Sequence, residues 1–278
     1  MNAHLVAARR RERWRRLPLA TVGILVLLFL ALPILVVVPM SFSSAESLRF
    51  PPPGLSLRWY EAFFSDPLWL EAALNSLIVG ISSSTIALGL GTLAAYGIVR
   101  GTFWGRGALE TNFISPMILP PVIIAVALYI FYARIGILGN YLALIAAHVV
   151  IAVPYVVLLM TLAIRSFDIR VEQVALTLGA SRWQMMTRVL MPNLLPNAAA
   201  AWLFAFVISF DEVVVTLFVS GTHLTIPKRM FNQLVLQINP TITAIATILI
   251  CFSLAAVALA AWLNRGNGFV SKADGEGH

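Results

Sequence analysis

Long apolar segments alternate along the chain with shorter polar and basic stretches. A bilayer core about 30 Å thick is crossed by roughly 20 residues of helix. Six segments reach that length with few or no charges, so the pattern predicts an all-α membrane protein with six transmembrane helices. The predicted spans are residues 17–41, 75–99, 113–131, 142–164, 198–219 and 242–263.

The composition supports this class, because 60% of the residues are hydrophobic, 11% are charged and the mean hydropathy is +0.89. These values are not those of a soluble domain. The first span is too long for a signal peptide and lacks a clear small-residue cleavage site, so we expect a retained helix. We divide the chain into a basic N-terminal arm over 1–16, a transmembrane domain over 17–263 and a polar tail over 264–278.

The distribution of Lys and Arg between the loops predicts how the chain is oriented in the membrane. With six spans, both termini lie on one side of the membrane together with loops 100–112 and 165–197. That side carries fourteen Lys and Arg residues, and the other side carries five. We therefore predict that both termini and these two loops are cytoplasmic. The pI near 10.2 then reflects topology and attraction to anionic lipid headgroups, not nucleic-acid binding.

Prolines and small residues distinguish two of the spans. The third contains Pro116 and the pair Pro120-Pro121. Each proline removes a backbone donor, so we expect this helix to be kinked or locally unwound. Such a break is tolerated at membrane depth only where protein or a water-filled cavity covers it. The second span has a row of small residues that allows close helix packing, namely Ser83, Ala87, Gly91 and Ala95.

The longest external loop, 42–71, contains an amphipathic stretch over 57–64. We expect this loop to lie along the outer membrane–water interface. Its aromatic residues Trp59, Tyr60 and Trp69 are then predicted to belong to an interfacial belt.

Asp211 and Glu212 are the only acidic residues inside the six predicted spans. Asp211 lies thirteen residues beyond Ala198, or about 20 Å along a helix, which is near or just past the midplane. A central Asp costs about 2.5–3.5 kcal/mol on insertion scales. The two carboxylates are therefore expected to face water or a partner.

On a continuous helix, Glu212 aligns with Ser209 and Thr216 in a small, polar stripe that we predict to face a pore. Asp211 aligns with Phe204 on an aromatic stripe, where it contacts a partner helix or forms an aromatic–carboxylate pocket. Carboxylates beside aromatic faces suit amines. The alternative is that both carboxylates pair with an arginine of a partner subunit. The candidate substrate path comprises Asp211, Glu212, Ser209, Thr216 and Phe204.

The chain lacks the motifs of several enzyme classes. Neither Lys228 nor Lys272 lies in a Walker A sequence, so the chain is not expected to hydrolyse ATP. The single Cys251 cannot form a disulfide framework. His148 is expected to be a packing residue with its hydrogen bonds satisfied, and no metal-ligand spacing is present. An intramembrane hydrolase is therefore disfavoured.

The polar segment EQVALTLGASRWQMMTRVLMP, residues 172–192, lies between two predicted spans and has a spacing of its own. Ala175 is followed by Gly179 and then, thirteen residues later, by Pro192. The segment resembles the EAA loop of binding-protein-dependent ABC permeases, in which a Glu-Ala-Ala run precedes the Gly and a Pro follows thirteen residues after it. The family Glu falls on Gln173 here, while Glu172 is one residue away.

Further segments resemble the spermidine/putrescine-type permeases. They are SFDEVVVTLFVSG at 209–221, Pro227-Lys228, SPMILPP at 115–121, and the start of the sixth span at 239–247. The resemblance covers about residues 17–263. Relatives that import aminophosphonates, opines or iron share much of it.

The resemblance implies a type I ABC importer permease fold in the bacterial inner membrane, with a cytoplasmic coupling helix in loop 165–197. It implies no cofactor in this chain, because a separate ATPase dimer binds ATP and Mg. The other implied partners are a second permease subunit of a different, homologous chain, a periplasmic solute-binding protein and membrane lipid. The coupling residues that it implies are Glu172, Gln173, Ala175, Gly179, Ala180, Arg182 and Pro192.

The predicted function is thus the permease subunit of an ATP-driven importer of polyamines or related small amines. An aminophosphonate, an opine or an iron complex is the alternative cargo. A proton-coupled secondary transporter using Asp211 and Glu212 is a further alternative, which inverted repeats would favour. No such repeat is evident in the sequence.

Overall fold

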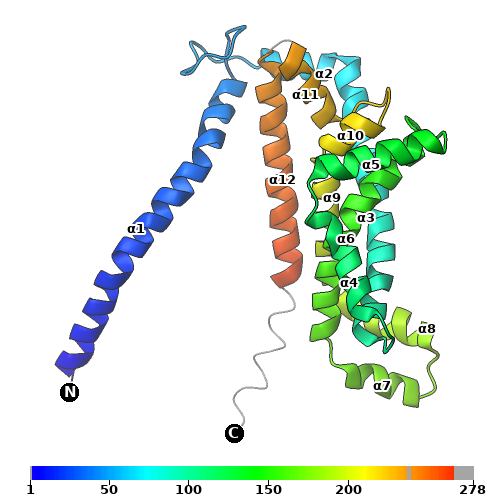
Figure 1. The fold of residues 1–278 in the computed structure, drawn as a ribbon. Helices are drawn as coiled ribbons and strands as arrows, with labels where there is room; N and C mark the ends of the chain where they lie inside the picture. Colours follow the sequence, from blue (N-terminus) through cyan, green and yellow to red (C-terminus); the bar gives the residue numbers. More distant parts are fainter. Residues whose placement is uncertain (1, 237–238, 266–278) are drawn as a thin grey trace. The chain divides into compact units, whose positions relative to one another are not determined.

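Figure 1 shows the computed structural model of the protein, which describes residues 2–236 and 239–265. Helices account for most of these residues, as the sequence predicts. Of the tail predicted over 264–278, residues 266–278 lie outside the described part. The helices form two compact units, and each is described here by itself. These are Met1–Ser65 with Gln237–Leu249, and Asp66–Leu236 with Ile250–His278.

In the first unit, helix α1 (Asn2–Ser41) continues from the predicted basic arm into the first span without a break. Its apolar part, Ala20–Ser41, is long and hydrophobic enough to cross a membrane. The short helix α2 (Arg58–Ser65) follows the external loop. Helix α12 (Thr241–Arg265), the predicted sixth span, begins in this unit and ends in the other.

The interfacial belt predicted from the aromatic residues of the external loop is wrong for both tryptophans. Trp59 is 8% exposed and Trp69 is 2% exposed. The Trp59 indole N–H donates to the Ser43 carbonyl at 2.8 Å. In the second unit, the Arg229 guanidinium lies 4.5 Å from the centre of the Trp69 ring. Polar groups of the chain thus take the place that the lipid headgroups were expected to fill.

Three long helices form the core of the second unit, and each packs against the other two. They are α3 (Pro67–Arg100), α6 (Tyr141–Ser166) and α9 (Met191–Phe210). A side-chain cap begins two of them, since Asp66 accepts from the Leu68 N–H and Asn140 accepts from the Leu142 N–H. Such caps satisfy backbone donors that have no partner within the helix.

The small-residue row on α3 is confirmed as a packing surface. Ser83, Ala87, Gly91 and Ala95 are all buried. At Gly91 the two helices α3 and α6 approach closely, because an added Cβ would lie only 2.6 Å from Cγ1 of Val156. Gly91 therefore permits the close packing of α3 on α6.

The third predicted span is broken at its prolines, as expected. Helix α4 (Arg106–Ile114) leads into a 3-10 turn (Ser115–Met117), and α5 (Pro121–Arg134) follows at 101° to it. Proline opens both the 3-10 turn and α5, because neither Pro116 nor Pro121 can continue the hydrogen-bond ladder of the preceding helix.

This bent pair crosses the second unit from one end to the other. Arg100 donates to the carbonyls of Ile164 and Phe167, so the last turns of α3 and α6 lie together. Because α6 starts at its opposite end, with Tyr141, the chain between Arg100 and Tyr141 must traverse the unit. In the described part of the chain, five helices are long and apolar enough to span a membrane, and the bent pair makes a sixth.

The fifth predicted span differs from its prediction at both ends. The helix begins sixteen residues before Ala198, with α8 (Arg182–Met185), and a π-helical turn (Met186–Leu190) joins α8 to α9. After α9 ends at Phe210, three residues interrupt the helix before α10 (Val214–Val219). The prediction of a single helix over residues 198–219 is therefore wrong.

Helix α11 (Ile226–Leu236) follows α10 and packs against the start of α3. Asn75 donates to the Leu224 carbonyl, and the Ser76 hydroxyl accepts from the Ile226 N–H. In Figure 1, α10 and α11 lie at one end of the second unit, and helix α7 (Ile169–Thr177) lies at the other.

Candidate functional site

A cavity of about 260 Å³ lies where the two interrupted helices meet. Pro116 and Pro121 border it from the break between α4 and α5, and Asp211 and Glu212 border it from the break after α9. Tyr155 of α6 adds an aromatic side chain to the wall. The prediction that the broken third span faces protein or a cavity is confirmed. Both carboxylates line that same cavity.

The two carboxylates have different surroundings. Glu212 is half-buried, and its carboxylate accepts the Val215 N–H at 2.9 Å. Its carbonyl also accepts the Thr216 hydroxyl, so Glu212 stabilises the first turn of α10. Asp211 is exposed and makes no side-chain hydrogen bond or ion pair within the described part of the chain. Asp211 is therefore the carboxylate that is free to bind a ligand directly.

Ser209 and Thr216 do not line this cavity, contrary to the prediction. Ser209 is 3% exposed and Thr216 is fully buried. The two ring nitrogens of His148 lie 2.8 Å from the Ser209 hydroxyl and 3.0 Å from the Thr216 hydroxyl. Ser83 of α3 completes the network at 2.8 Å from Ser209. His148 is thus a packing residue with both nitrogens satisfied, as predicted, and it joins the two sides of the break.

The helical wheel failed here because the helix ends at Phe210, so positions before and after the break share no continuous face. Phe204 remains on α9, where its side chain is 49% exposed and does not border the cavity. Its ring packs against that of Tyr155, with centroids 5.6 Å apart. Phe204 therefore supports the cavity wall through Tyr155.

A second region of interest lies at the opposite end of the unit, around α7. Gly179 lies just past the end of α7, and its φ of +92° is the left-handed conformation that glycine adopts at little cost. The Gly179 N–H donates to the Leu176 carbonyl, and the Ala180 N–H donates to the Ala175 carbonyl. This pair of bonds is a Schellman motif, which requires a left-handed residue after the helix.

Helix α8 begins at Arg182, three residues after Gly179, and its N-cap Ser181 forms a capping box. The Ser181 hydroxyl accepts the Gln184 N–H, and the Gln184 side chain accepts the Ser181 N–H. Pro192 is the second residue of α9, just after the π-helical turn, where the missing donor of a proline is tolerated because the ladder is already irregular. These local signals fix the turn between α7 and α8.

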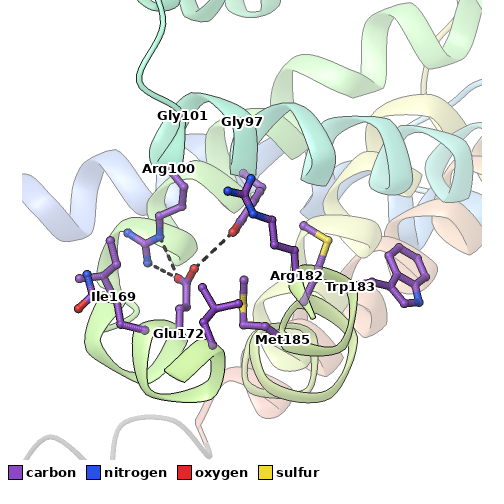
Figure 2. A pocket seen from close by; sticks show the side chains of 12 residues that line it. Gly97, Arg100, Gly101, Ile169, Glu172, Arg182, Trp183 and Met185 are labelled. Atoms are coloured by element: carbon purple, nitrogen blue, oxygen red, sulfur yellow. Dashed lines mark hydrogen bonds and ion pairs between the residues drawn. The ribbon is translucent and has the colours of Figure 1, made fainter. Parts of the chain in front are cut away.

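Figure 2 shows a pocket between the end of α3, α7 and α8, with a volume of about 480 Å³. Gln173 and Arg182 line it, and Arg182 reaches toward α3 while Trp183 points away. Glu172 is buried at the base, where Arg100 forms an ion pair with its carboxylate at 2.7 Å. The Tyr96 hydroxyl lies 3.5 Å from the second carboxylate oxygen.

Sequence reasoning missed Arg100 and Tyr96. They lie 72 and 76 residues before Glu172, so no local pattern connects them to it. The capping box was also missed, but the sequence does contain its signal, which is the Ser-x-x-Gln spacing of Ser181 and Gln184.

The family model for "Binding-protein-dependent transport system inner membrane component" matches residues 87–268. The chain belongs to this family. This permease is therefore a transport component and not an enzyme, and the proton-coupled alternative is not supported.

Two relatives illustrate the range of this permease family. The spermidine/putrescine transport system permease protein PotC of Haemophilus influenzae is 33% identical over 240 residues, which cover 86% of this chain and 93% of that protein. The molybdenum transport system permease protein ModB of the same organism is 31% identical over 213 residues, with coverages of 70% and 93%.

The fold is also that of solved ABC importers. A crystal structure of a bacterial alginate ABC transporter, in complex with an alginate pentasaccharide-bound periplasmic protein, superposes with a TM-score of 0.64. The identity is 20%, and the match covers 95% of this chain and 96% of that chain. The likeness shows that this permease has the type I ABC importer fold.

Proposed function

We propose that this permease forms part of the transport path of an ATP-driven polyamine importer. The observation that carries the proposal is the cavity in which Asp211 and Glu212 lie together. No Lys, Arg or His is among the residues that line it. The two negative charges are therefore not neutralised from within this wall, and a cationic cargo is the complementary ligand.

The physical argument concerns desolvation. Removing an ammonium group from water costs several kcal/mol unless an opposite charge compensates. Asp211 supplies an uncommitted carboxylate, and Tyr155 supplies an aromatic face that attracts cations. The named relative that carries spermidine and putrescine supports the same cargo class.

An aminophosphonate, an opine or an iron complex is the second candidate cargo class. The molybdenum permease is 31% identical to this chain, so overall similarity does not decide between cargoes. Two carboxylates in the cavity repel an oxyanion and favour a cargo that bears an ammonium group or a metal cation.

The proposal includes a separate ATPase dimer that binds ATP and Mg and docks on α7 and α8. The apolar side chains that α7, its C-terminal end and α8 leave largely exposed in the described chain support it. We call them the docking surface. It comprises Val171, Val174, Leu178 and Trp183, which are 44%, 56%, 83% and 71% exposed.

The proposed orientation places the docking surface and both termini in the cytoplasm. Its support is the excess of fourteen cationic residues over five on that side of the predicted topology. A second, homologous permease chain and a periplasmic solute-binding protein complete the proposed transporter. The solved relative in complex with a periplasmic protein supports the latter.

The test is uptake of labelled spermidine by proteoliposomes that contain the assembled transporter. Asp211→Asn and Glu212→Gln should each lower uptake and cargo-stimulated ATP hydrolysis, and the double variant should lower both further. The affinity of the isolated binding protein for spermidine should not change. Glu71→Gln is the matched control, because Glu71 is an exposed carboxylate of α3 that does not border the cavity.

Wild-type uptake by both single variants and the double variant, with an intact complex, would exclude the cargo role. If Asp211→Asn instead weakens the association of the permease subunits, the carboxylate pairs with a partner arginine. Calorimetry of the binding protein against amines, an aminophosphonate, an opine and an iron complex identifies the cargo class. A protein that binds no amine would overturn the polyamine proposal.

A further inference from the structure

Arg100 is the last residue of α3, and its guanidinium joins three helices at the end of the unit where α7 lies (Figure 2). Its Nε and Nη2 lie 2.9 and 2.7 Å from Oε1 of Glu172 in the first turn of α7. Nη2 also donates to the carbonyls of Ile164 and Phe167, at 3.1 and 2.9 Å, where α6 ends. One side chain thus connects α3, α6 and α7.

Each of these acceptors carries partial or full negative charge, although the Ile164 carbonyl also accepts the Phe167 N–H at 3.3 Å. The last carbonyls of a helix have no partner within it and carry partial negative charge. Glu172 is 4% exposed, and a buried carboxylate is stable only when it is paired. The planar guanidinium presents several N–H groups in fixed directions, whereas a lysine ammonium is a single point charge. The arrangement is therefore specific for arginine at this position.

Glu172 is held inside the chain although it lies on the docking helix. Arg100 binds one of its carboxylate oxygens, and the Tyr96 hydroxyl of α3 lies near the other. The adjacent Gln173 is exposed. Helix α7 therefore has two faces, of which the docking surface is open to a partner and the other is ion-paired to the transmembrane helices.

We propose that Arg100 is a positioning residue for transport, which transmits a displacement of α7 to α3 and α6. This inference rests on the proposed docking of α7 on the ATPase. Helix α7 is otherwise linked through the connection Phe167–Asp168, through the weaker contact of the Tyr96 hydroxyl with Glu172, and through packing of Ala175 on the core and of α7 on α8 and the π-helical turn. Helix α6 carries Tyr155 in the cavity wall, so a displacement passed to α6 reaches the transport path.

The experiment uses the complete transporter in proteoliposomes and measures spermidine imported per ATP hydrolysed. Arg100→Gln should retain the ATPase in the complex and continue to hydrolyse ATP, while the ratio of spermidine to ATP falls about tenfold or more. Arg100→Lys, which keeps the charge, should recover part of the ratio. Arg165→Gln is the matched control, because Arg165 forms an ion pair with Glu110 nearby but is 51% exposed.

An unchanged ratio in Arg100→Gln, with the complex intact, would overturn the inference. If Arg100→Gln does not assemble, Arg100→Lys decides, since an assembled lysine variant with a normal ratio also overturns it. Failure of both variants to assemble would show that Arg100 only stabilises the fold. If the ATPase does not co-purify with the wild-type chain, the proposed docking itself fails, which is a separate outcome.

Discussion

The close approach of α3 and α6 can be tested by the substitution Gly91→Ala. The added Cβ would lie 2.6 Å from Cγ1 and 2.8 Å from Cβ of Val156, whereas carbon atoms in contact lie about 3.5–4.0 Å apart. Val156 is fully buried, and a β-branched side chain in a helix has one strongly preferred rotamer. It therefore cannot turn away, and overpacking of this kind costs about 1–3 kcal/mol.

The helix propensity of alanine offsets part of this loss, because alanine is more favourable than glycine by up to ~1 kcal/mol. Gly89 provides the matched control, since it lies in the same helix and an added Cβ there meets nothing within 4 Å. Both variants gain the same propensity, so their difference isolates the packing. We expect Gly91→Ala to be less stable than Gly89→Ala by about 1–3 kcal/mol.

The free energy of unfolding can be measured for both purified variants in bicelles by titration with SDS, followed by circular dichroism. The expected difference corresponds to roughly 5- to 150-fold in the unfolding equilibrium constant. Equal stability of the two variants would refute the reasoning, because the helices would then not be in contact at Gly91.

Three further predictions concern the docking region and the helix caps. Gly179→Val should release the ATPase from the purified complex, whereas Gly179→Asn should retain most of it, because Asn tolerates a positive φ; equal recovery with both would contradict the explanation. A cysteine at position 181, in a variant with Cys251 replaced, should react with an impermeant thiol reagent in inside-out vesicles only, and labelling in intact cells would disprove the proposed orientation. Asn140→Ala should lower the free energy of unfolding by about 1 kcal/mol through loss of a helix cap, and Asn140→Asp should not; an equal loss in both would show that the cap contributes little.

The spans, the proline break and the end of α7 could be predicted from the sequence because their causes are local. A run of apolar residues is enough to identify a span, and Pro116 is enough to break one. Gly179 marks a helix end because its backbone conformation is unfavourable for other residues. The close contact at Gly91 could also be predicted, because a glycine within a row of small residues allows a neighbouring helix to pack closely.

The break after α9 could not be predicted, because neither Pro nor Gly marks it in the sequence. Apolar residues flank Asp211 and Glu212, and they read as a continuous helix. His148, which lies on another helix, bonds Ser209 before the break and Thr216 after it. The polar stripe expected to face a pore is therefore satisfied inside the protein. Pairings between distant elements of this kind become visible only in the folded chain.

The π-helical turn Met186–Leu190 determines the direction in which the chain presents Trp183. A π-helical turn accommodates one residue more than an α-helical one, and each residue of a helix rotates the chain by ~100°. If the same residues were wound as a regular α-helix, α8 would be rotated by about that angle relative to α9. The π-helical turn thus sets the direction in which Trp183 faces, whereas α7 and its C-terminal end position Val171, Val174 and Leu178.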